Sequence, residues 1–200
     1  MKTKKLVQLS LFSAIILVLA STPLGYIPLG FMNATTIHIP VILGSILLGP
    51  QYGAFLGFIF GLSSLVKSTL EPTVTSFIFT PFYTLGNTSG NFWSLVICFV
   101  PRILIGITPY YMYQLIKGRN KKLALLVAGI VGSLTNTILV LGGVYVFFGA
   151  SFATVMAVPI QTLFSVIISI VAINGIPEAL IAGLLTVAIC SIMLPILNKE

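Results

Sequence analysis

Charged residues are scarce in this chain. Only 6% of its 200 residues are charged, whereas roughly 25% are charged in an average soluble protein. Its 3 acidic residues and 1 histidine are too few for a paired-carboxylate acid–base site or a cluster of metal ligands. The sequence also has no phosphate-binding loop of the GxxxxGKS type. We therefore expect no catalytic site, no metal site and no cofactor.

Cysteine is equally scarce, and basic residues are not spread along the chain. Cys98 and Cys190 both lie in apolar runs, which predicts buried thiols rather than a disulfide framework. Most of the 10 basic residues fall into two short clusters, at residues 2–5 and 117–122. This distribution excludes nucleic-acid binding by a broad basic face. It is typical of the positive charges that set membrane topology.

Hydrophobic residues are abundant instead. They make up 58% of the chain, and the mean hydropathy of +1.15 indicates a polytopic membrane protein. We predict an all-α fold that forms a single integral membrane domain. Its six transmembrane helices are expected at about residues 5–22, 37–49, 51–67, 92–117, 121–148 and 174–197. The second and third are short for a hydrocarbon core of ~30 Å, which needs ~20 residues. The fourth is expected to kink or break at Pro101 and Pro109.

The connections between these spans suggest a topology. With six spans, the amino terminus, the basic segment 117–122 and the carboxyl terminus all lie in the cytoplasm, as the positive-inside rule favours. The outer loops are then residues 23–36, 68–91 and 149–173, and we expect the first two to act as a lid. Residues 155–173 are apolar but carry Pro159 and Gln161. We expect an outer loop or half-helix there, with a seventh span as the alternative.

Small residues recur at helical spacing. Gly49, Gly53, Gly57 and Gly61 are four residues apart and form a ridge without side chains that lets another helix approach closely. We expect close packing inside the bundle, with contact to a partner subunit as the alternative. The first helix carries a shorter version of this pattern, with Ser10 and Ala14.

A few polar residues lie at membrane depth. An arginine at a helix centre costs about 2.5 to 3.5 kcal/mol on insertion scales, so Arg102 needs a partner. Glu178 is expected at a comparable height, with Asn174 one turn before it on the same face. Arg102 and Glu178 either pair with each other or with carbonyls freed by nearby prolines, or one of them meets a polar ligand. Asn136 either lines the same cavity or forms an interhelical hydrogen bond.

The remaining candidates have simpler structural interpretations. His38 is expected to anchor a loop, and Lys67 and Glu71 to form a solvated pair. Aromatic residues near the predicted interfaces, such as Tyr26, Tyr83 and Trp93, fit an aromatic belt, with stacking on a ligand ring as the alternative.

Several motifs occur in a characteristic order along the chain. They are IHIPVILG from residue 37, LGPQYGAFLG from residue 48, PRILIG from residue 101 and NGIPE from residue 174. In this order, the sequence resembles the substrate-binding S-component of energy-coupling factor (ECF) transporters over essentially its whole length. The resemblance implies a plasma-membrane vitamin-uptake subunit that works with a transmembrane coupling subunit and two separate ATPase subunits. It also implies that Ser10 and Ala14 contact the coupling subunit.

The resemblance implies a pocket in the outer half of the bundle. The expected substrate-binding residues are Arg102, Asn136, Asn174, Glu178, Phe79, Tyr83, Asn87 and Trp93. The PRILIG and NGIPE motifs look most like the pantothenate group, and Arg102 suits the carboxylate of an anionic ligand. Pyridoxine or hydroxymethylpyrimidine, and then riboflavin, are the alternatives. Outside this family, a ligand-free structural membrane protein and an intramembrane enzyme using Glu178 or His38 stay open.

Overall fold

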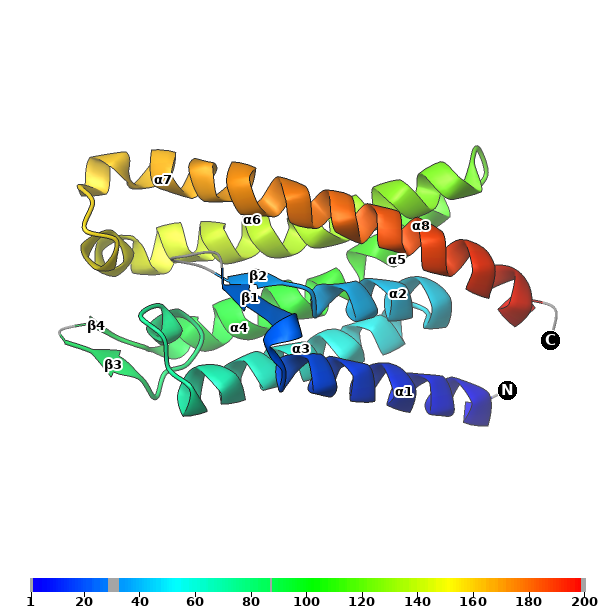
Figure 1. The fold of residues 1–200 in the computed structure, drawn as a ribbon, viewed down its shortest axis with the longest axis horizontal. Coiled ribbons are helices and arrows are strands. Elements are labelled where there is room, and N and C mark those ends of the chain that lie inside the picture. The colour runs from blue at the N-terminus through cyan, green and yellow to red at the C-terminus, as the bar shows by residue number, and fades with distance from the viewer. Residues whose placement is uncertain (1, 29–32, 87, 199–200) are drawn as a thin grey trace.

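The chain is almost entirely helical. The computed structural model describes residues 2–28, 33–86 and 88–198 (Figure 1). Its α-helices are α1 (Lys2–Ala20), α2 (His38–Leu48), α3 (Pro50–Leu70), α4 (Phe92–Ile105), α5 (Thr108–Ile116), α6 (Lys121–Val155), α7 (Leu163–Ile170) and α8 (Ile176–Asn198). Two small antiparallel hairpins pair β1 (Tyr26–Pro28) with β2 (Asn33–Thr35) and β3 (Thr84–Leu85) with β4 (Thr88–Ser89). Short helical turns occupy Pro23–Gly25, Ser76–Ile78, Ile160–Thr162 and Val171–Gly175.

The helices confirm the prediction of an all-α membrane protein. Among the described residues, five helical segments are long and apolar enough to cross a membrane: Thr3–Ala20, Pro50–Leu70, Phe92–Ile116, Lys121–Val155 and Ile160–Leu197. Helix α2 is a shorter apolar helix. A chain with several such segments is a multi-pass membrane protein.

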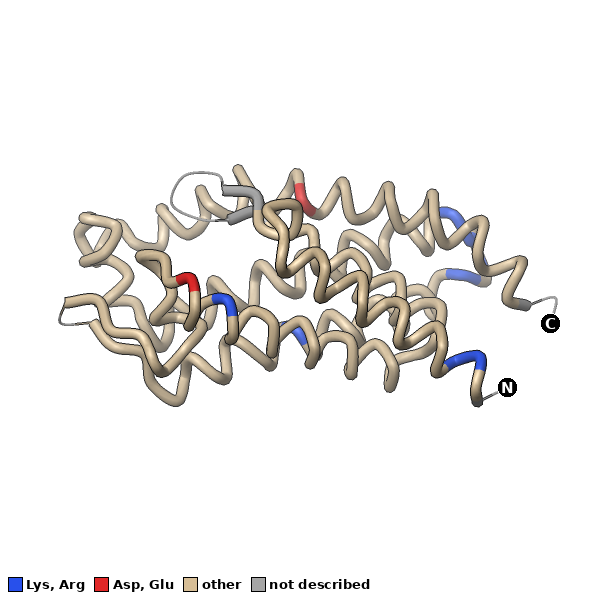
Figure 2. The backbone as a smooth tube through the Cα atoms, turned by 60° about the horizontal axis from the view of Figure 1, so that its bottom comes forward, with Lys and Arg blue, Asp and Glu red and all other residues tan. Residues whose placement is uncertain are grey.

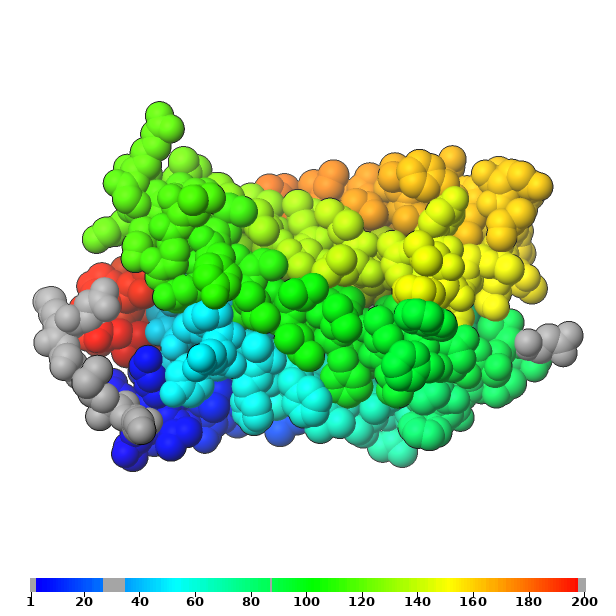
Figure 3. Space-filling model, turned by 180° about the vertical axis from the view of Figure 1, so that it is seen from behind, coloured from blue at the N-terminus to red at the C-terminus, as the bar shows by residue number. Residues whose placement is uncertain are grey.

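The helices form two layers (Figure 1). Helices α6, α7 and α8 make one layer, and α1, α3 and α4 make the other, with α2 and the β1–β2 hairpin between them. The most extensive packing joins α6 to α8 and α3 to α4. From behind, the green α4–α5 segment lies between cyan α3 and yellow-green α6 (Figure 3).

The glycine ridge packs inside this bundle. A Cβ atom at Gly53 would collide with the Gly106 carbonyl, and one at Gly57 with the Arg102 carbonyl. At Gly61 a Cβ would lie 2.8 Å from the Phe99 ring. The ridge therefore brings α3 against α4, as the packing interpretation predicted. Gly49 has another role, because its φ of 107° ends α2 in a conformation that favours glycine.

Proline and polar caps set the helix ends. The predicted fourth span divides into α4 and α5 at Gly106–Ile107, where Pro109 occupies the first turn of α5. Pro101 lies inside α4 without ending it. Asn91 caps α4 by accepting a hydrogen bond from the Trp93 N–H (2.9 Å), and Asn120 caps α6 in the same way.

The segment 149–173, expected to be an outer loop or half-helix, is mostly helical. Helix α6 continues to Val155 with a kink at Phe148, and a turn containing Ala157 at φ 53° follows. From Ile160 the chain is helical to the end of α8, so the last helical segment starts earlier than residue 174. Pro159 precedes this segment instead of interrupting it. The π-helical turn Val171–Gly175 lies just before Pro177. Because Pro177 has no backbone N–H, it cannot donate the helical hydrogen bond to the Ile173 carbonyl.

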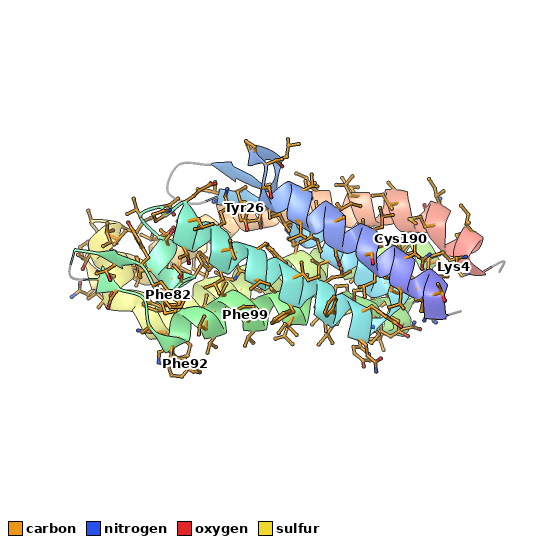
Figure 4. The ribbon with its side chains drawn as sticks, turned by 90° about the horizontal axis from the view of Figure 1, so that it is seen from below. Lys4, Tyr26, Phe82, Phe92, Phe99 and Cys190 are labelled. Carbon is orange, nitrogen blue, oxygen red and sulfur yellow. The ribbon has the colours of Figure 1, made fainter. Side chains whose placement is uncertain are left out.

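The first turn of α1 and the last turn of α8 lie at the same end of the bundle. Figure 2 shows this end, which also carries the basic residues of the first helix and of the connection between α5 and α6. Figure 4 shows Phe82 and Phe92 at the end opposite to Lys4. The basic clusters predicted to set topology therefore share one end of the molecule.

Candidate functional site

A polar site lies between two hydrophobic cores. One core joins α1, α2, α3 and the amino-terminal part of α6 around residues such as Ile42, Leu56 and Phe60. The other joins α4, the carboxyl-terminal part of α6 and α7 around Phe77 and Phe148. Arg102 of α4 lies between Ile97 of the second core and Ile105 of the first. Apolar residues therefore lie on both sides of Arg102 along the bundle, so the hydrogen bonds of its side chain matter strongly.

Arg102 is buried at this junction, with 4% of its surface exposed. Its Nη1 donates a hydrogen bond to the Ile97 carbonyl at 2.8 Å. This carbonyl is free because Pro101 has no N–H to complete the helical bond. The guanidinium carbon lies 4.9 Å from the centroid of the Phe79 ring and 5.3 Å from that of Phe60. Two aromatic faces and one carbonyl thus stabilise the cation.

The arginine retains unused hydrogen-bonding capacity. Its Nε has no hydrogen-bond partner in the described part of the protein. Within that same part, Lys67–Glu71 is the one ion pair, so the alternative in which Arg102 pairs with Glu178 is not formed. The other alternative, a hydrogen bond to a carbonyl freed by a proline, is formed with Ile97. It uses only one of the five N–H donors that a guanidinium carries. A buried guanidinium with unused donors can bind an anion.

A pocket with two lobes opens around this guanidinium. The cavity volume is about 90 Å³ in the lobe beside α3 and about 70 Å³ in the lobe beside α8. Three residues line both lobes: Thr35, Phe79 and Arg102. The lobes therefore form one site centred on Arg102.

The α8 lobe gathers the predicted polar residues. Asn136 of α6, Asn174 of the π-helical turn and Glu178 of α8 all line it. The Asn136 Oδ1 atom is buried with no hydrogen-bond partner among the described residues. Glu178 Oε1 accepts a hydrogen bond from the Thr35 backbone N–H at 2.9 Å. The lobe thus offers hydrogen-bonding groups from three different elements opposite Arg102.

The π-helical turn shapes this wall. Gly175 packs so closely against α6 that a Cβ atom there would lie 2.9 Å from Thr137 Cγ2. Both Asn174 and Gly175 line the lobe. Single π turns inside α-helices are frequent at functional sites, and here the turn is part of the pocket wall.

The α3 lobe is rich in hydroxyl groups that the sequence analysis did not assign to the site. They belong to Tyr26, Ser64, Ser68, Thr73, Thr75 and Ser76. The Tyr26 hydroxyl lies 3.1 Å from Ser64 Oγ, and burial raises the pKa of Tyr26 from its ordinary value. Lys67 and Glu71 also line this lobe, and they form the predicted ion pair at 2.8 Å. The hydroxyl-rich run from Thr73 to Ser76 was the available sequence signal.

Other predicted site residues lie elsewhere. Trp93 stacks on Phe147 with ring centroids 3.9 Å apart and is 43% exposed, while Tyr83 packs beside the second core. Neither lines the two lobes. Asn87 falls outside the described residues. His38 is buried at the start of α2 and does not line either lobe.

The predicted partner contact lies on α1. Ser10 and Ala14 are both exposed on this helix, and the Ser10 hydroxyl is satisfied by the Leu6 carbonyl at 3.0 Å. Large apolar residues on α1 are exposed as well, including Val7, Leu11 and Val18. This face is therefore smooth and apolar around two small residues.

Comparison with known proteins gives consistent matches. The chain is 42% identical over 159 residues to the pantothenic acid transporter PanT of Lactococcus lactis subsp. cremoris, which covers 79% of this chain and 76% of that protein. It is 31% identical over 208 residues to the pantothenate transporter PanT of Leuconostoc mesenteroides subsp. mesenteroides, which covers 99% of this chain and 96% of that protein. Residues 4–190 match the family described as ECF transporter, substrate-specific component. This chain belongs to the family of substrate-specific components of ECF transporters.

Proposed function

We propose that the protein is the high-affinity pantothenate-binding subunit of an ECF-type transporter. The observation that carries this proposal is the buried Arg102, whose guanidinium lines a pocket and whose Nε has no hydrogen-bond partner among the described residues. The similarity to two proteins named as pantothenate transporters supports the same ligand.

The site fits a carboxylate with a polar chain. The carboxylate of the ligand binds Arg102, because a guanidinium and a carboxylate match in charge and geometry. The hydroxyl and amide groups of the ligand then face Asn136, Asn174 and Glu178 in the α8 lobe. Phe79 covers the guanidinium from the loop between α3 and α4. The ligand makes no covalent bond, so binding and release are enough for the function.

Transport requires partners. The first turn of α1, the last turn of α8 and the basic clusters lie at one end of the bundle (Figure 2), which we place in the cytoplasm because positive residues favour that side. A transmembrane coupling subunit binds the α1 face around Ser10 and Ala14, and two separate ATPase subunits supply the energy. The pocket then opens toward the outside, where the vitamin is captured.

A vitamin panel tests this proposal. Purified protein is dialysed to equilibrium against labelled pantothenate, pyridoxine, hydroxymethylpyrimidine or riboflavin, and bound ligand is counted. We expect saturable binding of pantothenate at one site per chain and no competition by the others. Binding of another vitamin instead would reassign the ligand, and binding of none would favour a structural role. Tryptophan emission is a poor assay here, because Trp93 stacks on Phe147 away from the pocket.

A further inference from the structure

The β1–β2 hairpin connects the two layers across the pocket. At the base of this hairpin, Tyr26 of β1 pairs with Thr35 of β2. On one side, the Tyr26 hydroxyl lies 3.1 Å from Ser64 Oγ of α3, and Lys67 Nζ lies 5.4 Å from the centroid of the Tyr26 ring. Figure 4 shows Tyr26 where the hairpin approaches α3. On the other side, the Thr35 N–H donates to Glu178 of α8 at 2.9 Å. We call this crossing, formed by Tyr26 and Thr35, the strap.

The two attachments of the strap are unequal. The α3 side has a hydroxyl contact and a cation over an aromatic ring. Next to the strap, Thr36 Oγ1 donates a hydrogen bond to the Leu24 carbonyl, and the Thr36 N–H donates one to the Gly25 carbonyl. Among the residues that the structure describes, the Thr35–Glu178 bond is the one hydrogen bond between the strap and α8. The α8 attachment therefore depends on one carboxylate.

Glu178 has capacity for a second donor. An ionised carboxylate can accept hydrogen bonds on both oxygens, and within the described residues only Oε1 is occupied. Both Glu178 and Thr35 line the α8 lobe, and Thr35 also lines the α3 lobe. A hydroxyl group of a ligand in the α8 lobe can thus reach the same carboxylate that holds the strap.

We propose that Glu178 is a positioning residue that couples ligand binding to closure of the strap. Its Oε1 holds the Thr35 N–H, and its Oε2 accepts a hydrogen bond from a hydroxyl group of the ligand. Two hydrogen bonds fix the plane of the carboxyl group, so each bond favours the other. The strap slows ligand dissociation while it is attached. The identity of the ligand rests on the proposed function, but the attachment of the strap does not.

Two pairs of variants separate the strap from direct ligand contact. Thr35→Pro removes the backbone N–H, whereas Thr35→Val also loses the hydroxyl but keeps the N–H. Glu178→Leu removes the acceptor, whereas Glu178→Gln keeps an acceptor oxygen for Thr35. Thr35→Pro and Glu178→Leu should each detach the strap from α8. Because both substitutions break the same hydrogen bond, the double variant should detach it no further than either single variant.

Hydrogen exchange of the ligand-free protein provides the first measurement. Amides of residues 23–28 and 33–36 should exchange at least tenfold faster in Thr35→Pro and Glu178→Leu than in Thr35→Val and Glu178→Gln, respectively. Unchanged exchange in Glu178→Leu would overturn the attachment. This result does not depend on pantothenate, so failure of the proposed function leaves it interpretable. If Thr35→Pro does not fold, the Glu178 pair still decides.

The dissociation rate of labelled pantothenate provides the second measurement. It should be at least tenfold higher for Thr35→Pro than for Thr35→Val, a difference of about 1.4 kcal/mol. Equal rates in these two variants, with a faster rate in Glu178→Leu, would show that Glu178 only contacts the ligand and would overturn the coupling. Faster exchange without faster dissociation would overturn it as well.

Discussion

Replacing Arg102 with leucine removes the charged hydrogen-bond donor that lines both lobes of the pocket. The Phe79 ring covers this guanidinium. Arg102 is 4% exposed, and its guanidinium donates a hydrogen bond to the Ile97 carbonyl, while its Nε has no hydrogen-bond partner among the described residues. A hydrogen bond to a charged group contributes about 1.5–3 kcal/mol. The dissociation constant for pantothenate should therefore rise about 10- to 150-fold in Arg102→Leu.

Further variants distinguish binding from folding. Arg102→Lys keeps the charge but loses the planar fork that matches a carboxylate, so its affinity should fall between those of the native protein and Arg102→Leu. Arg119→Gln, in the exposed turn between α5 and α6, is the matched loss of a positive charge and should bind normally. Equilibrium dialysis gives the affinities, and thermal unfolding reports integrity. Native affinity in a folded Arg102→Leu protein would refute the assignment of Arg102 to the ligand carboxylate.

Three further predictions follow from the packing. Gly57→Ala should lower thermal stability by about 1–3 kcal/mol, as overpacking does, and weaken pantothenate binding, because a Cβ there meets the Arg102 carbonyl; Gly118→Ala, in open space, is its control. Trp93→Phe should leave pantothenate affinity within about twofold, or about 0.4 kcal/mol, since Trp93 stacks on Phe147; a larger loss in dialysis would place Trp93 at the ligand. Ala14→Phe should abolish cellular uptake but not binding by the purified protein, whereas Leu184→Phe, on the exposed side of α8, should retain uptake. Loss of binding in Ala14→Phe would contradict the proposed division of roles.

Much of the fold was predictable because membrane helices have strong sequence signals. The apolar runs predicted α1, α2 and α3, and prolines indicated the division between α4 and α5. The bounds of the helices after residue 149 were not predicted, because Pro159 and Gln161 resemble breaks inside a helix. In the structure they occupy its beginning, where a missing N–H and a polar side chain are tolerated. Periodicity alone does not distinguish these two positions.

The site was partly predictable for a related reason. Polar residues are so rare at membrane depth that Arg102, Asn136, Asn174 and Glu178 stood out, and all four line the pocket. The α3 lobe was not found, because serine and threonine are ordinary in membrane helices and loops. The role of Thr35 was equally hidden, since its backbone N–H makes the contact with Glu178 and no side-chain pattern records a backbone donor.

The packing below the site bears on how a ligand can leave it. One turn from Arg102 toward the end that carries the basic clusters, α4 presents Ile105, while α3 presents Leu56 and α2 presents Ile42, all fully buried. These side chains belong to one continuous core, which must separate before a polar ligand can pass through. Separating a close-packed apolar core around a polar molecule is strongly unfavourable. A ligand bound at Arg102 therefore leaves most easily through the side of the pocket that faces away from this core.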